Sequence, residues 1–480
     1  MQRLGIVGGL GPLAGADIFF KLVKSTPAGG DRDHLDILFE QHPFDEGHAF
    51  ADENFNPSAR KFYVYNTIRE LEKRDAGAII LTCFISHTFL DEIQPEIKPP
   101  IISIMEALRT HLACEYPGVR NLGILTSGYA RKKNLFENAF AGDHALIYPR
   151  PPAQRDGLME AIYGPRGIKA GNLRGESIEL ILRACHDVID QGAEIIVPGF
   201  TEIPVVIDAL RSSFNVPIVD CNQAYAEYAL AYQGLAPARP YKIGIVGGVG
   251  PAATVDFIDK VVARTAASRD QDHVKMVVEH NPQIPDRTEN LFGGGADPTI
   301  PLYSACKKLE TQGADMIAIP CNTAHAFVQR IQTFLGIPIV NMLFETVEAI
   351  KRRHPQCRAV GLLATSGTVG SRVYNDIIEA ASLRTVVPDA ECQDLVMRAI
   401  YGEQGVKAGF TDGQCRDDLL KALENVVEKG ADVVILGCTE LPLILAETDD
   451  FQIAGKRVAL IDPTDTLARK CVELARQASS

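Results

Sequence analysis

The sequence predicts an α/β fold built as two tandem units, each with two pseudo-symmetric three-layer lobes, mainly parallel sheets and a cleft between the lobes. Three observations predict this architecture. Motifs of the first half return in the second half, short β-branched runs alternate with helical patterns, and each half carries a weaker repeat of its own.

The duplication is visible in glycine-rich and strand-end motifs. Three segments recur about half a chain length later: residues 5–12 as 244–251, 161–171 as 399–409, and 198–204 as 436–442. A period this long indicates gene duplication rather than a solenoid of short repeats. We expect one unit at 1–237 and a second at 241–480, separated by a linker that contains Gly234, Pro237 and Pro240.

The parallel sheets follow from the order of the elements. In the first half, short β-branched runs at 76–81, 122–125, 194–197 and 216–219 are interleaved with helical patterns. Strands alternating with helices favour parallel sheets covered by helices on both faces. In the second half, three pairs of runs resemble each other: 243–246 and 359–363, 316–319 and 433–436, 337–340 and 458–461.

This internal resemblance divides each unit into two lobes. We expect lobes of about 1–117 plus 222–237 and of 118–221 in the first unit. In the second unit we expect lobes of about 241–355 plus 464–480 and of 356–463.

Composition excludes several classes of protein. The chain has 480 residues, 46% of them hydrophobic and 23% charged, which is ordinary for a globular protein. A formal net charge of −13 argues against a nucleic-acid partner. No apolar run reaches membrane-spanning length, and a strand pattern that begins at Leu4 leaves no room for a signal peptide, so we expect a cytoplasmic protein. Eleven cysteines without a C-x-x-C pair predict reduced thiols rather than disulfides or a zinc ribbon.

Two cysteines of the second half follow equivalent strands. Cys321 ends the run 316–319 and Cys438 ends the run 433–436. Ligands of open α/β sheets bind beyond the carboxyl ends of the strands, so both thiols are expected to face one interlobe cleft. A thiol at a helix start is readily converted to thiolate. Two weak bases on opposite faces of one carbon suit removal of a proton from one side and its return from the other.

The motifs around these cysteines are similar to those of a known family. Pro320-Cys321-Asn322-Thr323-Ala324-His325, residues 436–440, 247–251 and 285–288 together resemble the aspartate racemase branch of the aspartate/glutamate racemase superfamily, over residues 241–480. The resemblance implies a racemase that needs no cofactor and no pyridoxal phosphate, with Cys321 and Cys438 as the two acid/base residues. It also implies that Arg287 and Lys407 hold the substrate carboxylates, which suits the bidentate geometry of an arginine.

The expected substrate contacts surround the two thiols. Asn322 and Thr323 are candidate donors to a substrate carboxylate. The full expected set is Gly250, Arg287, Asn322, Thr323, Thr365, Ser366, Lys407 and Thr439, with His325 and Glu440 as supporting residues behind it. Cys321 and His325 could suggest a metal pair, but without further ligands a packed histidine is favoured and no metal is expected.

The first half departs from the pattern. Cys83 matches Cys321, but Phe200 stands where Cys438 is expected, and phenylalanine carries no exchangeable proton. His48 aligns with Arg287, so the carboxylate clamp is lost or weakened, whereas Lys169 matches Lys407. We expect a first unit without racemase activity that serves as a built-in substitute for a second subunit, with further homo-oligomerisation open. Cys221 has no catalytic counterpart and is interpreted as structural.

Two other functions remain as alternatives. Residues 248–253 fit the G-x-G-x-x-A pattern of dinucleotide sites, but the acidic ribose ligand expected about 20 positions on has no clear candidate, Glu279 being nearly thirty residues away, which makes a dehydrogenase the weaker interpretation. The first unit could instead carry a single-cysteine decarboxylase or isomerase activity, or bind an amino acid as a regulator. For the second unit, the resemblance favours aspartate as substrate, then glutamate, and no membrane or nucleic-acid partner is expected.

Overall fold

The computed structural model describes residues 3–42, 44, 55–234 and 239–479. It divides into two compact units, Met1–Arg239 (unit 1) and Pro240–Ser480 (unit 2).

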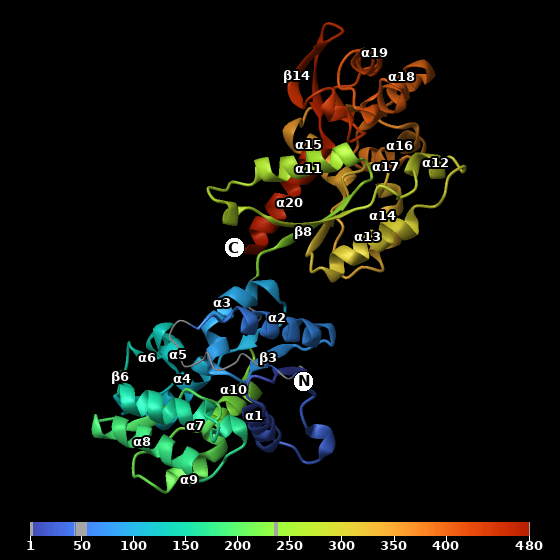
Figure 1. The fold of residues 1–480 in the computed structure, drawn as a ribbon. Coiled ribbons are helices and arrows are strands. Elements are labelled where there is room, and N and C mark those ends of the chain that lie inside the picture. Colours follow the sequence, from blue (N-terminus) through green and yellow to red (C-terminus); the bar gives the residue numbers. More distant parts are fainter. Residues whose placement is uncertain (1–2, 43, 45–54, 235–238, 480) are drawn as a thin grey trace. The chain divides into compact units, whose positions relative to one another are not determined.

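The first lobe of unit 2 is a parallel sheet with helices on both faces. Its strands, in the order β10-β8-β9, are β8 (Lys242–Gly247), β9 (Lys275–His280) and β10 (Met316–Ala318). Alternate residues of β8 face two separate cores. α13 (Thr299–Thr311) and α14 (His325–Gln332) pack in one core, and α11 (Pro251–Arg264) and α20 (Pro463–Ser479) pack in the other (Figure 1). α12 (Arg287–Leu291) lies in the connection after β9.

The second lobe of unit 2 is a five-stranded sheet in the order β12-β11-β13-β15-β14. Its strands are β11 (Ala359–Leu363), β12 (Arg384–Val386), β13 (Val433–Leu436), β14 (Thr448–Ile453) and β15 (Lys456–Ile461), and β14 alone of these pairs antiparallel. α18 (Ala390–Tyr401) and α19 (Gln414–Glu428) pack on one face. α15 (Met342–Arg353) and α17 (Val373–Ala380) pack on the other, and the short α16 (Ser366–Gly370) follows β11.

Two helices of unit 2 connect its lobes. α15 buries Leu343, Val347 and Ile350 in the core of the second lobe. α20 leaves the second lobe after β15 and buries Leu467 and Cys471 against the sheet of the first lobe. The two helices also pack on each other.

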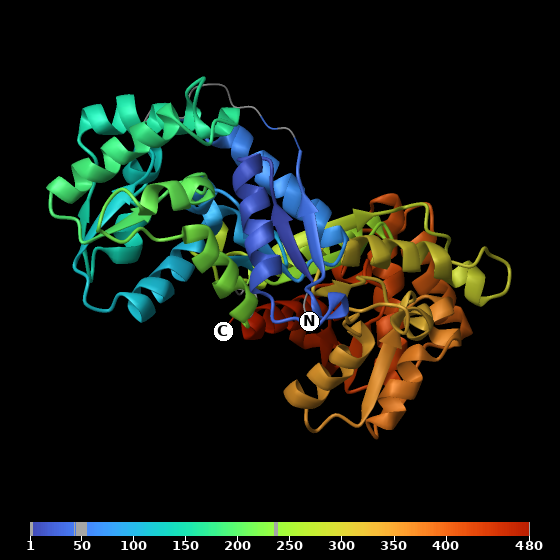
Figure 2. The ribbon, with the colours of Figure 1, turned by 90° about the horizontal axis from the view of Figure 1, so that it is seen from below.

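Unit 1 repeats this plan. Its first sheet, in the order β2-β1-β3-β4, contains β1 (Leu4–Val7), β2 (Ile37–Glu40), β3 (Ala78–Leu81) and β4 (Ile101–Ile102). Its second sheet, in the order β6-β5-β7, contains β5 (Asn121–Leu125), β6 (Ala145–Ile147) and β7 (Ile195–Pro198). Both sheets are parallel. Figure 2 shows the first lobe mainly in blue, with its helix at Cys221–Ala231 in green, and the second lobe in cyan to green.

The helices of unit 1 cover the faces of these sheets. They are α1 (Pro12–Ser25), α2 (Ser58–Lys73), α3 (Leu90–Ile93), α4 (Ile104–Glu115), α5 (Gly128–Lys132), α6 (Leu135–Phe140), α7 (Glu160–Tyr163), α8 (Glu176–Asp190), α9 (Ile207–Arg211) and α10 (Cys221–Ala231). α2 packs on one face of the first sheet, and α1, α4 and α10 pack on the other.

The α/β class, the mainly parallel sheets and the duplication are confirmed. Most expected runs form strands, but 216–219 and 337–340 contribute only single bridges, at Ile218 and Ile339. The hairpin of β14 and β15 was not expected, because residues 448–453 carry two aspartates and the alternating pattern there is weak.

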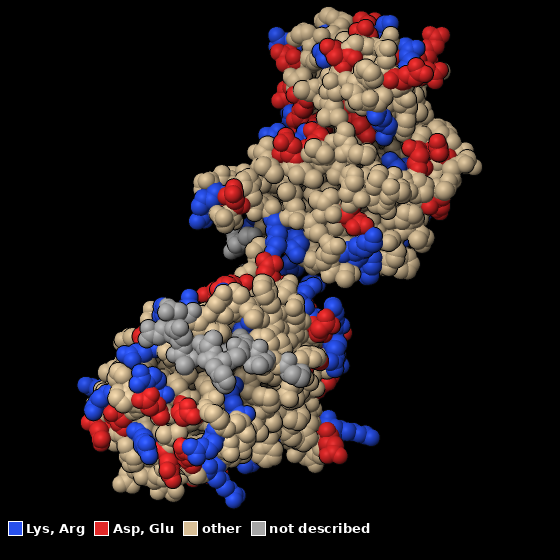
Figure 3. All heavy atoms as spheres, in the orientation of Figure 1, with Lys and Arg blue, Asp and Glu red and all other residues tan. Residues whose placement is uncertain are grey.

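The surface agrees with the charge expectation. On the face in Figure 3, basic and acidic side chains are interspersed over both units rather than gathered in a basic stripe. Among the described residues, no helix combines the length and apolarity needed to cross a bilayer.

Candidate active site

A small pocket lies between the two lobes of unit 2. Its volume is about 20 Å³, which is room for a single water molecule, so the lobes are closed upon it. The side chains that line it come from both lobes: Val249, Asp286, Arg287, Thr288, Cys321, Asn322, Thr323, Thr365, Tyr401, Lys407, Cys438, Thr439 and Glu440.

The two thiols reach this pocket from equivalent positions. Cys321 follows β10 in the turn before α14, and Cys438 follows β13. Each is at the carboxyl end of a parallel strand, where the sheet edge faces the opposite lobe. Both are 7% exposed, which shields them from bulk solvent while leaving a surface toward the cavity.

Glu440 controls the surroundings of Cys438. The Cys438 thiol donates a hydrogen bond to Glu440 Oε2 at 3.0 Å, and Lys407 Nζ lies 3.1 Å from Glu440 Oε1. Burial, followed by the Glu440 charge, raises the pKa of Cys438 well above its ordinary value, and the Lys407 cation partly offsets this. Cys438 is therefore held as a thiol, ready to donate a proton.

A glycine turn lets the Glu440 carboxylate approach the first lobe. Gly250 has φ +114°, which favours glycine, and a Cβ built there would lie 2.6 Å from Glu440 Oε1. The chain then enters α11 with Pro251 in its first turn. Because a carboxylate already faces this turn, a pyrophosphate group is disfavoured there.

Two buried donors of the pocket have no acceptor. Arg287 begins α12, and its Nη1 donates to the carbonyls of Ile284 at 3.3 Å and Pro285 at 3.1 Å. Its Nε is buried without a hydrogen-bond partner among the described residues. Asn322 Oδ1 accepts from the Tyr374 hydroxyl at 2.6 Å, whereas Asn322 Nδ2 is likewise without a partner in the described parts of the chain. Unpaired buried donors of this kind favour a ligand that carries acceptor oxygens.

Four threonine hydroxyls join the lobes beside these donors. Thr323 Oγ1 lies 2.7 Å from Thr368 Oγ1 and 3.3 Å from Thr365 Oγ1, and Thr288 donates to Thr365 at 3.3 Å. Thr288 and Thr323 belong to the first lobe, and Thr365 and Thr368 to the start of α16 in the second. The hydroxyl cluster therefore closes one side of the pocket.

His325 fixes the turn that carries Cys321. Its Nδ1 donates to the Cys321 carbonyl at 2.9 Å, and its Nε2 accepts from the Met342 N–H at 3.1 Å. Burial lowers the pKa of His325, which agrees with a neutral ring that uses both nitrogens in hydrogen bonds. With both nitrogens engaged, His325 supports the turn rather than binding a metal.

The equivalent region of unit 1 is apolar. Phe200 replaces Cys438 and contacts the Tyr163 ring, while Phe55, Ile85 and Tyr129 form a buried cluster against Cys83. Ile85 stands where unit 2 has Thr323, and Tyr129 stands where unit 2 has Gly367. Within the hydroxyl cluster, Thr323 and Thr368 of unit 2 thus correspond to Ile85 and Ala130 in unit 1, whereas Thr365 corresponds to the buried Ser127.

Unit 1 nevertheless keeps part of the charged framework. Lys169 Nζ pairs with Glu202 Oε1 at 2.7 Å, as Lys407 does with Glu440. Cys83 Sγ accepts from Arg60 Nη1 at 2.7 Å, so a cation on α2 contacts this thiol. His48, which the sequence alignment placed opposite Arg287, lies outside the described residues.

Comparison with known proteins decides the family. The Asp/Glu/hydantoin racemase family matches residues 7–229 and again residues 246–471. The chain belongs to this family. It is accordingly an enzyme of the racemase type, an isomerase, and it carries the family domain twice.

Individual relatives match one racemase domain at a time. The broad specificity amino-acid racemase RacX of Bacillus subtilis is 29% identical over 234 residues, covering 48% of this chain and 96% of that protein. A glutamate racemase of Shewanella baltica is 33% identical over 175 residues, covering 36% of this chain and 60% of that protein. The solved Picrophilus torridus aspartate racemase is 32% identical, with a TM-score of 0.43, and covers 49% of this chain and 94% of that one.

Most residues expected in the racemase site lie together. Of the expected set, the pocket is lined by Arg287, Cys321, Asn322, Thr323, Thr365, Lys407, Cys438 and Thr439. Gly250 lies behind the pocket against Glu440, and the Ser366 N–H donates to Met397 Sδ. Glu440, expected behind the site, lines the pocket itself.

Sequence reasoning missed four residues of the pocket, Val249, Asp286, Thr288 and Tyr401. Asp286 and Thr288 flank Arg287, and the Tyr401 hydroxyl donates to Asp286 Oδ2 at 3.4 Å across the lobes. Burial raises the pKa of Tyr401 to about 12, so it remains a neutral donor. Each of the four missed residues lies within or next to a sequence motif described above. That proximity was the sequence signal that could have predicted them.

In unit 1, Arg60 was also missed, because nothing in the sequence pairs an α2 residue with Cys83. Cys221 begins α10 and is fully buried, and burial raises its pKa well above the ordinary value. These surroundings suit a packing residue.

Proposed function

We propose that unit 2 racemises an acidic amino acid without a cofactor, by proton transfer between Cys321 and Cys438. The observation that carries this proposal is that one pocket is lined by both thiols and by two buried donors without acceptors, Arg287 Nε and Asn322 Nδ2. Thiols on either side of a substrate supply the acid and the base, and the donors supply a carboxylate site.

The proton path follows from the asymmetry of the two thiols. Cys438 is held protonated by burial and by Glu440, so it serves as the acid. Cys321 lines the same pocket as the buried Arg287 cation and is the remaining candidate base. In one direction, Cys321 takes the α-proton and Cys438 donates its own proton to the opposite face of the planar intermediate. The reverse reaction exchanges these roles, and Lys407 stabilises the charge when Cys438 becomes thiolate.

Two cations on different walls of the pocket favour a dicarboxylic substrate. Arg287 comes from the first lobe and Lys407 from the second, and each can neutralise one carboxylate. Glu440 already offsets part of the positive charge of Lys407. We therefore assign the stronger carboxylate contact to Arg287 and Asn322. Names of relatives include both aspartate and glutamate, and the resemblance of the sequence motifs favours aspartate.

Unit 1 is proposed to be inactive as a racemase and to have a structural role. It has one thiol in the equivalent positions, and Phe55, Ile85 and Tyr129 pack against that thiol. A regulatory amino-acid site or a single-cysteine reaction in unit 1 would need this cluster to open.

The direct test follows proton exchange at the α-carbon. Single L- and D-amino acids are incubated with the full chain in deuterated water, and inversion and α-deuterium are measured by chiral chromatography and mass spectrometry. We expect inversion of aspartate with deuterium in the product, loss of at least ~10²-fold in rate for Cys321→Ala and for Cys438→Ala, and little change for Cys83→Ala. Full activity in either of the first two variants would contradict the two-base mechanism.

The same preparation tests unit 1. Racemase activity that survives Cys83→Ala and Lys169→Met assigns the reaction to unit 2. Aspartate binding that persists in the double variant Arg287→Gln, Lys407→Gln and is lost on adding Arg60→Gln would instead show a ligand site in unit 1.

A further inference from the structure

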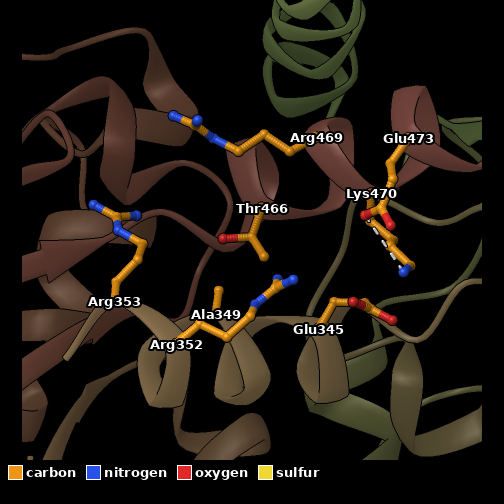
Figure 4. A pocket seen from close by; sticks show the side chains of 8 residues that line it. All are labelled: Glu345, Ala349, Arg352, Arg353, Thr466, Arg469, Lys470 and Glu473. Atoms are coloured by element: carbon orange, nitrogen blue, oxygen red, sulfur yellow. Dashed lines mark hydrogen bonds and ion pairs between the residues drawn. The ribbon is translucent and has the colours of Figure 1, made fainter. Parts of the chain in front are cut away.

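A second, larger pocket lies in unit 2 between α15 and α20. Its volume is about 150 Å³, which exceeds that of the closed catalytic pocket several-fold. Its lining residues are Glu345, Ala349, Arg352, Arg353, Thr466, Arg469, Lys470 and Glu473 (Figure 4). Neither catalytic cysteine is among them, so this is a separate cavity.

Basic side chains dominate the lining. Four of the eight residues carry a positive charge and two carry a negative charge. Arg353 forms ion pairs with Glu447 at 2.6 Å and with Asp449 at 2.7 Å. Arg469 forms an ion pair with Asp465 at 2.6 Å. These two arginines therefore have carboxylate partners outside the cavity.

The other two cations are available to a ligand. No hydrogen bond or ion pair joins Arg352 to another described residue, and Figure 4 shows its guanidinium reaching into the space between the helices. Lys470 approaches Glu473 only at 3.5 Å, a long contact that an incoming anion could replace. Arg352 and Lys470 lie on opposite walls, so one small anion could contact both.

Glu345 is the second acidic residue of the lining, besides Glu473, and it faces these cations. It is partly buried, and this burial raises its pKa, while Lys470 and Arg352 act to lower it. Its charge opposes anion binding, which makes it a useful position for a test.

The basic lining is specific to unit 2. The helices α4 and α10 of unit 1 match α15 and α20, since their N-caps Ser103 and Asp220 correspond to Asn341 and Asp462. Asp220 pairs with Lys21 at 2.8 Å and Asp462 pairs with Lys260 at 2.5 Å, and these equivalent ion pairs fix the alignment of α10 with α20.

This alignment identifies the unit 1 residues that replace the four cations. Arg352, Arg353, Arg469 and Lys470 correspond in unit 1 to Cys114, Glu115, Glu227 and Tyr228. Unit 1 has the same fold but no cation at these four positions, so the fold itself does not require cations there. The cations occur only in unit 2, the unit that has both pocket thiols.

We propose that the pocket between α15 and α20 is a regulatory site for a small oxyanion, of phosphate or polycarboxylate type, held by Arg352 and Lys470. The walls of this pocket belong to helices that bury their apolar sides in different lobes. An anion that joins the walls changes the free energy of lobe separation, and the closed catalytic pocket must open to admit substrate. The regulatory part rests on the proposed racemase function, whereas anion binding does not.

Binding is tested on the full chain by isothermal titration with inorganic phosphate and, in a second arm, with citrate, at constant ionic strength in chloride. The tighter of the two identifies the oxyanion chemistry. We expect saturable binding that weakens at least ~10-fold in the double variant Arg352→Gln, Lys470→Gln, because two charge-assisted contacts to the anion are lost. Lys351→Gln removes a neighbouring α15 charge outside the pocket, so its affinity should equal that of the parent.

Glu345→Gln provides a test that misfolding cannot imitate. Removing a negative charge from the lining should tighten oxyanion binding several-fold. Absence of binding by both anions, or equal affinity in the parent, the double variant and Glu345→Gln, would overturn the site.

Regulation is tested separately by racemisation kinetics. The bound anion should change kcat/KM in the parent and in Lys351→Gln but not in the double variant. Binding without any kinetic effect would overturn the regulatory role. A chain that binds the anion but racemises no amino acid would contradict the proposed function and leave the binding result standing.

Discussion

The Cys438 thiol donates to the Glu440 carboxylate at 3.0 Å, a contact that favours the protonated form of this thiol. Burial and the Glu440 charge both raise the pKa of Cys438. The same carboxylate pairs with Lys407, so the proton on Cys438 and the charge on Lys407 are controlled by one side chain.

Replacing Glu440 by Gln should lower the pKa of Cys438. The change replaces a negatively charged carboxylate, which favours the thiol by its charge and as a strong hydrogen-bond acceptor, with a neutral amide. The pH at which iodoacetamide labels Cys438, followed by peptide mass spectrometry, should therefore move to lower pH. Glu202→Gln alters the equivalent carboxylate of unit 1 and should leave Cys438 labelling unchanged. A shift to higher pH in Glu440→Gln would contradict this electrostatic assignment.

Replacing Lys407 by Met should act in the opposite direction. The Lys407 cation lowers the pKa of Cys438 and neutralises Glu440, so its loss disfavours the thiolate and leaves a buried carboxylate unpaired. We expect kcat/KM for racemisation to fall by about 10–100-fold, the cost of one charged hydrogen bond. Lys169→Met makes the same change in unit 1, where Lys169 pairs with Glu202. Equal losses in the two variants would show that the effect is not confined to unit 2.

Gly367 sets the distance between the lobes beside the threonine cluster. A Cβ at this position would lie 2.8 Å from Thr288 Cα, and Thr288 adjoins Arg287 on α12. Gly367→Ala should push α12 outward and raise KM for the amino acid more than it lowers kcat, because it displaces Arg287, the arginine that we propose binds a substrate carboxylate. At Gly370, three residues on, a Cβ would meet only Phe292 Cε1 at 3.9 Å, so Gly370→Ala should behave as the parent. Parent-like KM in Gly367→Ala would show that the contact yields without moving Arg287.

The sequence predicts the parts of the molecule that depend on local pattern and repetition. Cys321 and Cys438 follow buried strands, and parallel strands bring their carboxyl ends to one edge, so their common pocket could be anticipated. Asp286 and Tyr401 meet only because two lobes close, at 3.4 Å, and no spacing along the chain encodes that contact.

Two further features were hidden for the same physical reason. Arg60 contacts Cys83 from α2, a helix whose match in unit 2 provides no such residue, so alignment to Arg287 pointed to His48 instead. The basic pocket combines α15 with α20, which are more than a hundred residues apart in the chain, and it depends on how the two helices cross. Tertiary packing, rather than residue type, creates both.

His87 makes unit 1 sensitive to acid. Burial lowers the pKa of His87 to about 4, its Nε2 makes one long contact of 3.4 Å with the Leu81 carbonyl, and its Nδ1 is without a partner among the described residues. An unfolded histidine has a pKa near 6.5, so between about pH 6.5 and pH 4 the unfolded state binds more protons than the folded one. Stability must therefore fall as pH falls through this window, by up to about 3 kcal/mol at its lower end.

Buried cysteines of each unit report this loss separately. Cys185 lies in the core of unit 1 and Cys306 in that of unit 2, so urea-dependent labelling by an acid-tolerant disulfide reagent follows the two units in one sample. We expect the urea midpoint reported by Cys185 to fall between pH 7 and pH 4.5 in the parent and to fall less in His87→Phe, which cannot take up the proton. The urea midpoint reported by Cys306 also depends on pH, because burial lowers the pKa of His325 in unit 2. This pH dependence should be the same in the parent and in His87→Phe. An identical pH dependence of Cys185 labelling in the parent and in His87→Phe would mean that the imidazole stays accessible to protons in the folded unit.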